Sequence, residues 1–151
     1  MLNTRYSDIV SNTDQFVFHI LGCGAIGSSA ATQICRMGGT NFILYDYDKV
    51  DIVNIGVSQY NNSDIDKYKV DALEEHLKAI NPIIDVDKFN ERFEYYSPRS
   101  NDIAILGFDS MEARLEAVMI MCKINCAKPK FIIDGRMGAE HYQQYIFDNP
   151  T

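Results

Sequence analysis

The first segment that could do chemistry is rich in glycine and runs Gly22-Cys23-Gly24-Ala25-Ile26-Gly27. The apolar run Phe16–Leu21 precedes it, and apolar residues at helical spacing follow it. In this pattern the first glycine makes a tight turn, the second lets a phosphate approach the backbone, and the third lets the helix and strand pack closely. Amide groups at the start of the helix, at Ala25 and beyond, favour a bound anion. The segment therefore predicts a site for nucleotide phosphates.

A carboxylate follows the next predicted strand, at a position that suits the ribose of a nucleotide. The apolar run Phe42–Tyr45 ends at Asp46, which lies 19 residues after Gly27. A carboxylate at this strand end accepts hydrogen bonds from ribose hydroxyls. The pattern is compatible with NAD, FAD, S-adenosylmethionine or ATP, because the fold alone does not choose among them.

Strands and helices alternate along the chain. The strands are predicted at Phe16–Leu21, Phe42–Tyr45, Ile83–Phe89 (nearer an edge), Ile103–Leu106, Phe131–Ile133 and from Gln144 onward. This order predicts one Rossmann-like α/β domain over residues 1–151, with a mostly parallel sheet and helices on both faces. Ligands of such sheets bind beyond the carboxyl ends of the strands. We therefore expect Gly22, Asp46, Asp109 and Asp134 to gather along one edge.

The helices between these strands are predicted from capping residues and apolar spacing. Ser63 or Asp64 is expected to cap one helix, and Asp109 or Ser110 the next. The buried face of the latter helix is predicted to carry Leu115, Val118, Met119 and Cys122.

Composition excludes several classes of protein. The net charge is −7 with scattered lysines and arginines, so we expect no nucleic-acid partner. The apolar runs are too short to span a bilayer, and the first ten residues contain no apolar signal segment, so a cytoplasmic protein without a membrane partner is expected. The four cysteines include no C-x-x-C pair, which favours buried, reduced thiols. The three histidines share no spacing and are expected to be structural or exposed.

Several further segments resemble the motifs of one family. These are Asp46-Tyr47-Asp48-Lys49-Val50, then Asn54, Gln59-Tyr60, Asp64-Ile65-Asp66-Lys67-Tyr68-Lys69, Gly107-Phe108-Asp109-Ser110 with Arg114, and Ile132–Gly138. Together they resemble the ThiF/MoeB/HesA family of ubiquitin-activating-type adenylyltransferases. The resemblance covers about Val17 to Phe147.

The resemblance implies roles for individual residues. It implies that Asp46 holds the ribose, that Asn54, Gln59 and Lys69 contact the phosphates or shape their pocket, and that Asp109 holds Mg²⁺. Asp48 is expected in the same cofactor site, with a plain turn residue as the alternative. Lys69 and Asp109 could instead be a solvated helix lysine and a helix cap. The implied cofactors are ATP and Mg²⁺, and Asp109, Lys69 and Arg136 are the expected catalytic residues.

The chain also departs from the family pattern. Ser58 stands where the family has an Arg before the Gln, and Asp66 stands where it has a Gly. The paired zinc-binding cysteines are absent, and no cysteine suits thioester transfer. Arg136, flanked by Gly135 and Gly138, is the expected replacement cation, and Arg5 is a second candidate. Family members continue for further strands, so we expect this chain to be truncated relative to them.

The function predicted from these features is adenylation of the C-terminal carboxylate of a small ubiquitin-like or sulfur-carrier protein ending in Gly. The resemblance also implies a homodimer. Two alternatives also fit the sequence: an NAD(P)-binding oxidoreductase domain, and a non-catalytic nucleotide-binding or dimerisation module of the same fold.

Overall fold

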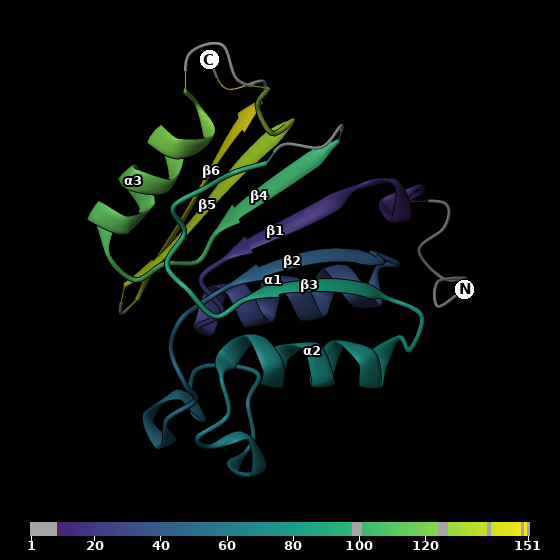
Figure 1. Ribbon diagram of the computed structural model, residues 1–151, viewed down its shortest axis with the longest axis vertical. Helices are drawn as coiled ribbons and strands as arrows, with labels where there is room; N and C mark the ends of the chain where they lie inside the picture. The colour runs from purple at the N-terminus through teal and green to yellow at the C-terminus, as the bar shows by residue number, and fades with distance from the viewer. Residues whose placement is uncertain (1–8, 98–100, 124–126, 139, 149, 151) are drawn as a thin grey trace.

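The computed structural model (Figure 1) describes residues 9–97, 101–123, 127–138, 140–148 and 150. Its centre is a six-stranded sheet in the order β3-β2-β1-β4-β5-β6, parallel except for β6, which pairs antiparallel with β5. The strands are β1 Val17–Leu21, β2 Asn41–Tyr45, β3 Asp85–Phe89, β4 Asp102–Leu106, β5 Phe131–Gly138 and β6 His141–Asp148. The helices are α1 Ala25–Arg36, α2 Lys69–Ile80 and α3 Met111–Met121. Short 3-10 turns cover Thr13–Gln15, Ile52–Asn54 and Asn62–Asp64.

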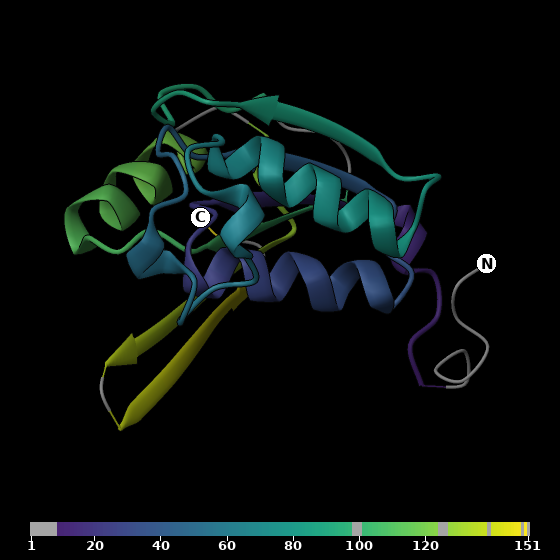
Figure 2. The same ribbon diagram turned by 90° about the horizontal axis from the view of Figure 1, so that it is seen from below.

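The central strands are buried on both faces, as their continuous apolar runs require. Successive side chains of β1 enter different cores: Ile20 packs with residues of α1 and α2, and Leu21 packs with residues of α3. Helices α1 and α2 thus cover one face and α3 covers the other (Figures 1 and 2). This confirms the predicted Rossmann-like sheet with helices on both faces, and β3 lies at an edge as expected.

The register of the central strands decides which residues emerge together. Leu21 of β1 pairs with Tyr45 of β2 and with Leu106 of β4. The next residues along the chain, Gly22, Asp46 and Gly107, therefore leave the sheet side by side at its carboxyl edge. At the far edge, β5 and β6 form a long hairpin that extends away from the body of the domain (Figure 2).

The predicted cap of α2 is wrong. Helix α2 begins at Lys69, whereas Asn62–Asp64 form a separate 3-10 turn in which Asp64 accepts a hydrogen bond from the Asn61 N–H at 2.8 Å. Between the two elements, Asp66 adopts a left-handed backbone with φ 70°, so a helix cannot continue from Asp64 into α2.

The predicted buried face of α3 is also wrong in part. Leu115 and Met119 are 61% and 64% exposed, whereas Arg114, Ala117 and Met121 face the core. Apolar side chains occur around most of this helix, so their spacing does not select a face. Hydrogen bonds from the Arg114 guanidinium to the carbonyls of Leu106 and Gly135 orient the helix instead.

The cysteines behave as structural residues where they are described. Cys23 and Cys35 are buried and Cys122 is half-buried, and burial raises the pKa of each thiol above its usual value. Cys126 lies outside the described residues. Of the helices that the structure describes, none is both long and apolar enough to cross a membrane.

The histidines are structural or exposed, as predicted. His19 is buried in β1, His76 pairs with Asp64, and His141 is exposed at the start of β6.

Candidate active site

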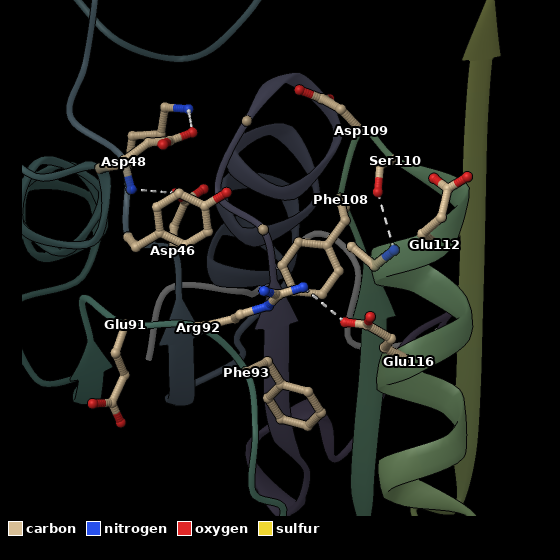
Figure 3. A pocket seen from close by; sticks show the side chains of 16 residues that line it. Asp46, Asp48, Glu91, Arg92, Phe93, Phe108, Asp109, Ser110, Glu112 and Glu116 are labelled. Atoms are coloured by element: carbon tan, nitrogen blue, oxygen red, sulfur yellow. Dashed lines mark hydrogen bonds and ion pairs between the residues drawn. The ribbon is translucent and has the colours of Figure 1, made fainter.

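A cavity of about 310 Å³ lies at the carboxyl ends of β1, β2 and β4 (Figure 3). From β1 the chain proceeds outward to β2 on one side, and the later strand β4 lies on the other side. Ligands of open α/β sheets bind at this reversal of strand order. The lining residues are Gly22, Gly24, Asp46, Tyr47, Asp48, Lys69, Glu91, Arg92, Phe93, Gly107, Phe108, Asp109, Ser110, Glu112, Ala113 and Glu116.

The three glycines of the turn have different surroundings. Gly22 has φ 93°, and a Cβ atom there would lie 2.8 Å from the Gly107 carbonyl carbon. A Cβ atom on Gly27 would lie 1.8 Å from the Gly22 oxygen, whereas one on Gly24 would meet nothing within 4 Å. Gly22 and Gly27 thus allow the strand ends and α1 to pack closely, and Gly24 leaves open space beside the pocket.

The N-terminus of α1, which starts at Ala25, faces this space without a cap. Gly24 is the N-cap residue, and among the described residues no side chain caps the first turn by a hydrogen bond. First-turn amide groups have no partner within a helix, so they are available to an anion.

Asp46 is fixed by backbone hydrogen bonds. Its Oδ2 accepts from the Cys23 N–H at 2.8 Å and its Oδ1 from the Asp48 N–H at 2.9 Å. Burial raises the pKa of this carboxyl, although the two N–H groups and nearby Lys69 oppose the shift. A carboxylate has about four acceptor positions, so two remain for ligand hydroxyls.

Lys69 is the buried cation of the pocket. Its Nζ lies 3.1 Å from Asp48 Oδ2, and the residue is only 8% exposed. Burial acts to lower its pKa, but the charges of Asp46, Asp48 and Asp109 outweigh burial and raise it. The ammonium therefore stays charged at neutral pH, which excludes the alternative of a freely solvated helix lysine.

Asp109 is not a helix cap. The Ser110 hydroxyl accepts the capping hydrogen bond from the Ala113 N–H at 3.0 Å. Within the described part of the chain, the Asp109 carboxylate has neither a hydrogen bond nor an ion pair, so both its oxygens are available. The described residues contain no group of three or more metal-ligating side chains, so these residues alone do not form a closed metal site.

Two residues expected at the nucleotide do not line the pocket. The Asn54 side chain accepts from the Asp51 N–H at 2.8 Å and completes a capping box around the 3-10 turn Ile52–Asn54. The Gln59 amide donates to the Ser29 hydroxyl of α1 at 3.3 Å. Hydrogen bonds within the loop and to α1 therefore engage both side chains.

Arg136 also lies outside the pocket lining. Its guanidinium contacts Asp134 Oδ2 at 2.6 Å and lies over the Tyr145 ring, 4.8 Å from its centroid. Arg114 binds the other oxygen of the same buried carboxylate. Arg5, the second candidate cation, lies outside the described residues.

The segment after β3 contributes pocket residues that the sequence did not indicate, because residues 90–100 show no periodicity. Glu91, Arg92 and Phe93 line the pocket, and Arg92 Nη2 lies 3.1 Å from Glu116 Oε2 on α3. One signal was available: residues that follow a predicted parallel strand reach the ligand edge of the sheet.

Comparison with known proteins agrees with this geometry. The model of the family described as the ThiF family matches residues 12–129. The chain belongs to the ThiF family. This ThiF-family chain is 32% identical over 112 residues to ubiquitin-like modifier-activating enzyme 5 of Rattus norvegicus, covering 64% of this chain and 28% of the relative. It is 34% identical over 85 residues to the enzyme of the same name from Bombyx mori, and this match covers 54% of this chain and 22% of the relative. The chain thus spans less than a third of the length of these curated relatives.

Solved structures show the same fold. E. coli MccB with MccA-N7isoASN matches with a TM-score of 0.70 and 22% identity, covering 82% of this chain and 36% of that chain. E. coli MccB solved with ATP matches with a TM-score of 0.70 and 22% identity, covering 82% and 37%. At this level of identity, the likeness establishes the ThiF-type fold.

Proposed function

We propose that this chain binds ATP with Mg²⁺ and adenylates the C-terminal carboxylate of a small ubiquitin-like or sulfur-carrier protein ending in Gly. The observation that carries the proposal is the meeting of Gly24, Asp46, Lys69 and Asp109 in one pocket. Two findings support it: the relatives are named ubiquitin-like modifier-activating enzymes, and MccB of the same fold has been solved with ATP.

The residues present suit a nucleotide. The two remaining acceptor positions of Asp46 would take the ribose hydroxyls. The uncapped start of α1 beside Gly24 would hold phosphate oxygens, and Lys69 would add a buried positive charge that lines the same pocket. An NAD(P) site has no need for Lys69 and Asp109, so the oxidoreductase alternative leaves both unexplained.

The charge of the pocket favours a divalent cation. Among the described residues, six carboxylates and two cationic side chains line it, so a triphosphate alone would be repelled. Mg²⁺ usually takes one or two protein carboxylates together with substrate phosphates and water. The free carboxylate of Asp109 fits this ligand set. When bound, Mg²⁺ would neutralise phosphate charge.

The proposed reaction is a displacement at the α-phosphorus of ATP. A carboxylate oxygen of the partner bonds to the α-phosphorus while the bond to the bridging oxygen of the β-phosphate breaks. The products are an acyl-adenylate and pyrophosphate, with the electron pair of the broken bond on pyrophosphate. Lys69 and the α1 amide groups would stabilise the charge that grows on these oxygens.

Thermal unfolding with ligands tests the nucleotide. A ligand that binds only the folded state raises the melting temperature by mass action, and we expect ATP with Mg²⁺ to do so more than NAD. Asp46→Ala should abolish the shift. Stabilisation by NAD but not by ATP with Mg²⁺ would favour the oxidoreductase alternative.

Exchange of labelled pyrophosphate into ATP tests the chemistry. We expect exchange that depends on a partner protein or peptide with a C-terminal Gly carboxylate, and no exchange when that carboxylate is amidated. Clear ATP binding without exchange across a panel of such partners would favour a non-catalytic module.

We also propose that the chain forms a homodimer in the cytoplasm. The family resemblance supports the dimer, and the free, buried thiols of Cys23 and Cys35 suit a reducing compartment. A monomer in sedimentation velocity at micromolar concentration would contradict the dimer, and microscopy of a tagged chain would test the compartment.

A further inference from the structure

The pocket has too little positive charge for a polyphosphate if Lys69 is its only cation. Lys69 already interacts with Asp48 at 3.1 Å and lies near the charges of Asp46 and Asp109. The rest of the lining adds Glu91, Glu112 and Glu116, and one more cation, Arg92.

The backbone that carries Arg92 is firmly held. The next residue, Phe93, is 6% exposed and packs edge-on against Tyr45, with 4.9 Å between ring centroids. Four residues after Arg92, the Tyr96 hydroxyl donates to Asp102 Oδ2 at 2.7 Å. These contacts fix the segment to the sheet face beside the pocket.

The Arg92 side chain, in contrast, is free to turn. It is 66% exposed and extends from its segment toward α3, where Nη2 meets Glu116 Oε2 (Figure 3). This is its sole hydrogen-bonding partner among the described residues, and Glu116 is itself 55% exposed. An exposed ion pair of this kind contributes little free energy, so exchanging it for another anion costs little.

The other arginines described near this edge of the sheet are not available to bind a ligand in the pocket. Arg114 and Arg136 are both bound to Asp134, and neither lines the pocket. A guanidinium matches phosphate oxygens with two parallel N–H donors, which a lysine cannot do. Within the described residues, Arg92 is the one guanidinium that lines the pocket.

We propose that Arg92 is the second phosphate-binding cation of this site and that Glu116 competes with the nucleotide for it. On binding, the guanidinium leaves Glu116 and donates to phosphate oxygens. In this role, Arg92 would replace the Arg that the family motif has at the position of Ser58. The inference rests on the proposed binding of ATP.

The test compares dissociation constants for ATP with Mg²⁺ and for adenosine, measured by calorimetry on the full chain. Arg92→Ala should weaken ATP binding about 10- to 100-fold, as expected for a charge-assisted hydrogen bond, and leave adenosine binding unchanged. Arg92→Lys should restore part of the affinity. Glu116→Gln should tighten ATP binding by up to about fivefold, the value of an exposed ion pair. Arg36→Ala, in the last turn of α1 and exposed, is the matched control.

The outcomes separate this inference from the proposed function. If the wild-type chain binds no ATP, both are rejected. If it binds ATP but Arg92→Ala matches Arg36→Ala, the inference alone is rejected. Equal weakening of ATP and adenosine would also overturn it, because the contact would not be with phosphate. Unchanged ATP binding in Glu116→Gln would show that Glu116 does not compete with the nucleotide for Arg92.

Discussion

Two groups of acidic and basic side chains lie at the same end of the sheet, yet their surroundings are opposite. Asp134 is buried and bound by Arg114 and Arg136, so its charge is satisfied within the protein. The group of Asp46, Asp48 and Lys69 opens onto the pocket and retains unused acceptor positions. A position at this end of the sheet is therefore not enough to assign a ligand role, because Asp134 lies within β5 and its charge is already paired. The unused bonding capacity distinguishes the two groups.

The largest expected change in stability comes from removing a partner of the buried Asp134 carboxylate. Arg114→Ala should lower the free energy of unfolding by about 3–5 kcal/mol, because it leaves the buried Asp134 carboxylate without its buried partner. Urea denaturation followed by circular dichroism measures this change.

Arg136→Ala is the matched control for that prediction. The Arg136 side chain is 38% exposed, and Arg114 still binds Asp134 in this variant, so the loss should be much smaller and ATP affinity should not change. Equal losses in the two variants would show that Asp134 does not depend on the buried guanidinium.

The second prediction compares two glycines of the same turn. Gly27→Ala places a methyl group against the Gly22 backbone oxygen and should cost about 1–3 kcal/mol of stability, the usual range for overpacking. Gly24→Ala meets no protein atom and should fold nearly as well as wild type, but it should weaken ATP binding because its methyl group occupies ligand space. Wild-type ATP affinity in Gly24→Ala would mean that phosphate does not approach the backbone there.

The smallest effect concerns Asp64, another buried carboxylate whose partners lie within the protein. Burial opposes its ionisation, but the Asn61 N–H, His76 and Lys67 outweigh burial and lower its pKa. Its contribution to stability is therefore full at neutral pH and is lost as the pH falls below the usual aspartate value and through the lowered pKa.

Asp64→Asn tests this dependence. It should cost on the order of 1.5 kcal/mol at pH 7, and the difference from wild type should shrink in acid. Unfolding curves of both proteins between pH 7 and pH 3 measure it. A difference that is independent of pH would show that the ionised form is not the stabilising one.

Much of the framework is predictable from the sequence, because a strand that is buried on both faces has a nearly continuous apolar run. The runs Phe16–Leu21 and Ile103–Leu106 contain few polar residues, and the structure places strands there. The carboxyl ends of parallel strands meet at one edge, and three of the four residues predicted to gather there, Gly22, Asp46 and Asp109, line one pocket. The fourth, Asp134, lies within β5 beside Leu106, is bound by two arginines and does not line the pocket.

What could not be predicted depends on contacts between distant segments. Arg92 reaches the pocket because Phe93 packs against Tyr45, and no local pattern shows that contact. Asn54 and Gln59 carry suitable chemistry, but neighbouring backbone and hydroxyl groups engage their side chains.

Asp66 is an intermediate case. Its residue type differs from the Gly of the family motif, and its backbone is left-handed with φ 70°, a conformation that Gly adopts most readily. Asp is among the few other residues that adopt this conformation readily.

Cys23, which lies between the first two glycines of the turn, affects how fast a ligand can bind. The Cys23 N–H donates to Asp46, and its carbonyl accepts from the buried Tyr60 hydroxyl at 2.5 Å. The turn is thus held from both sides before any nucleotide arrives, so its conformational entropy is lost during folding and not during binding. Association should then be limited by diffusion into the pocket and not by loop ordering, which gives rapid capture even when affinity is modest.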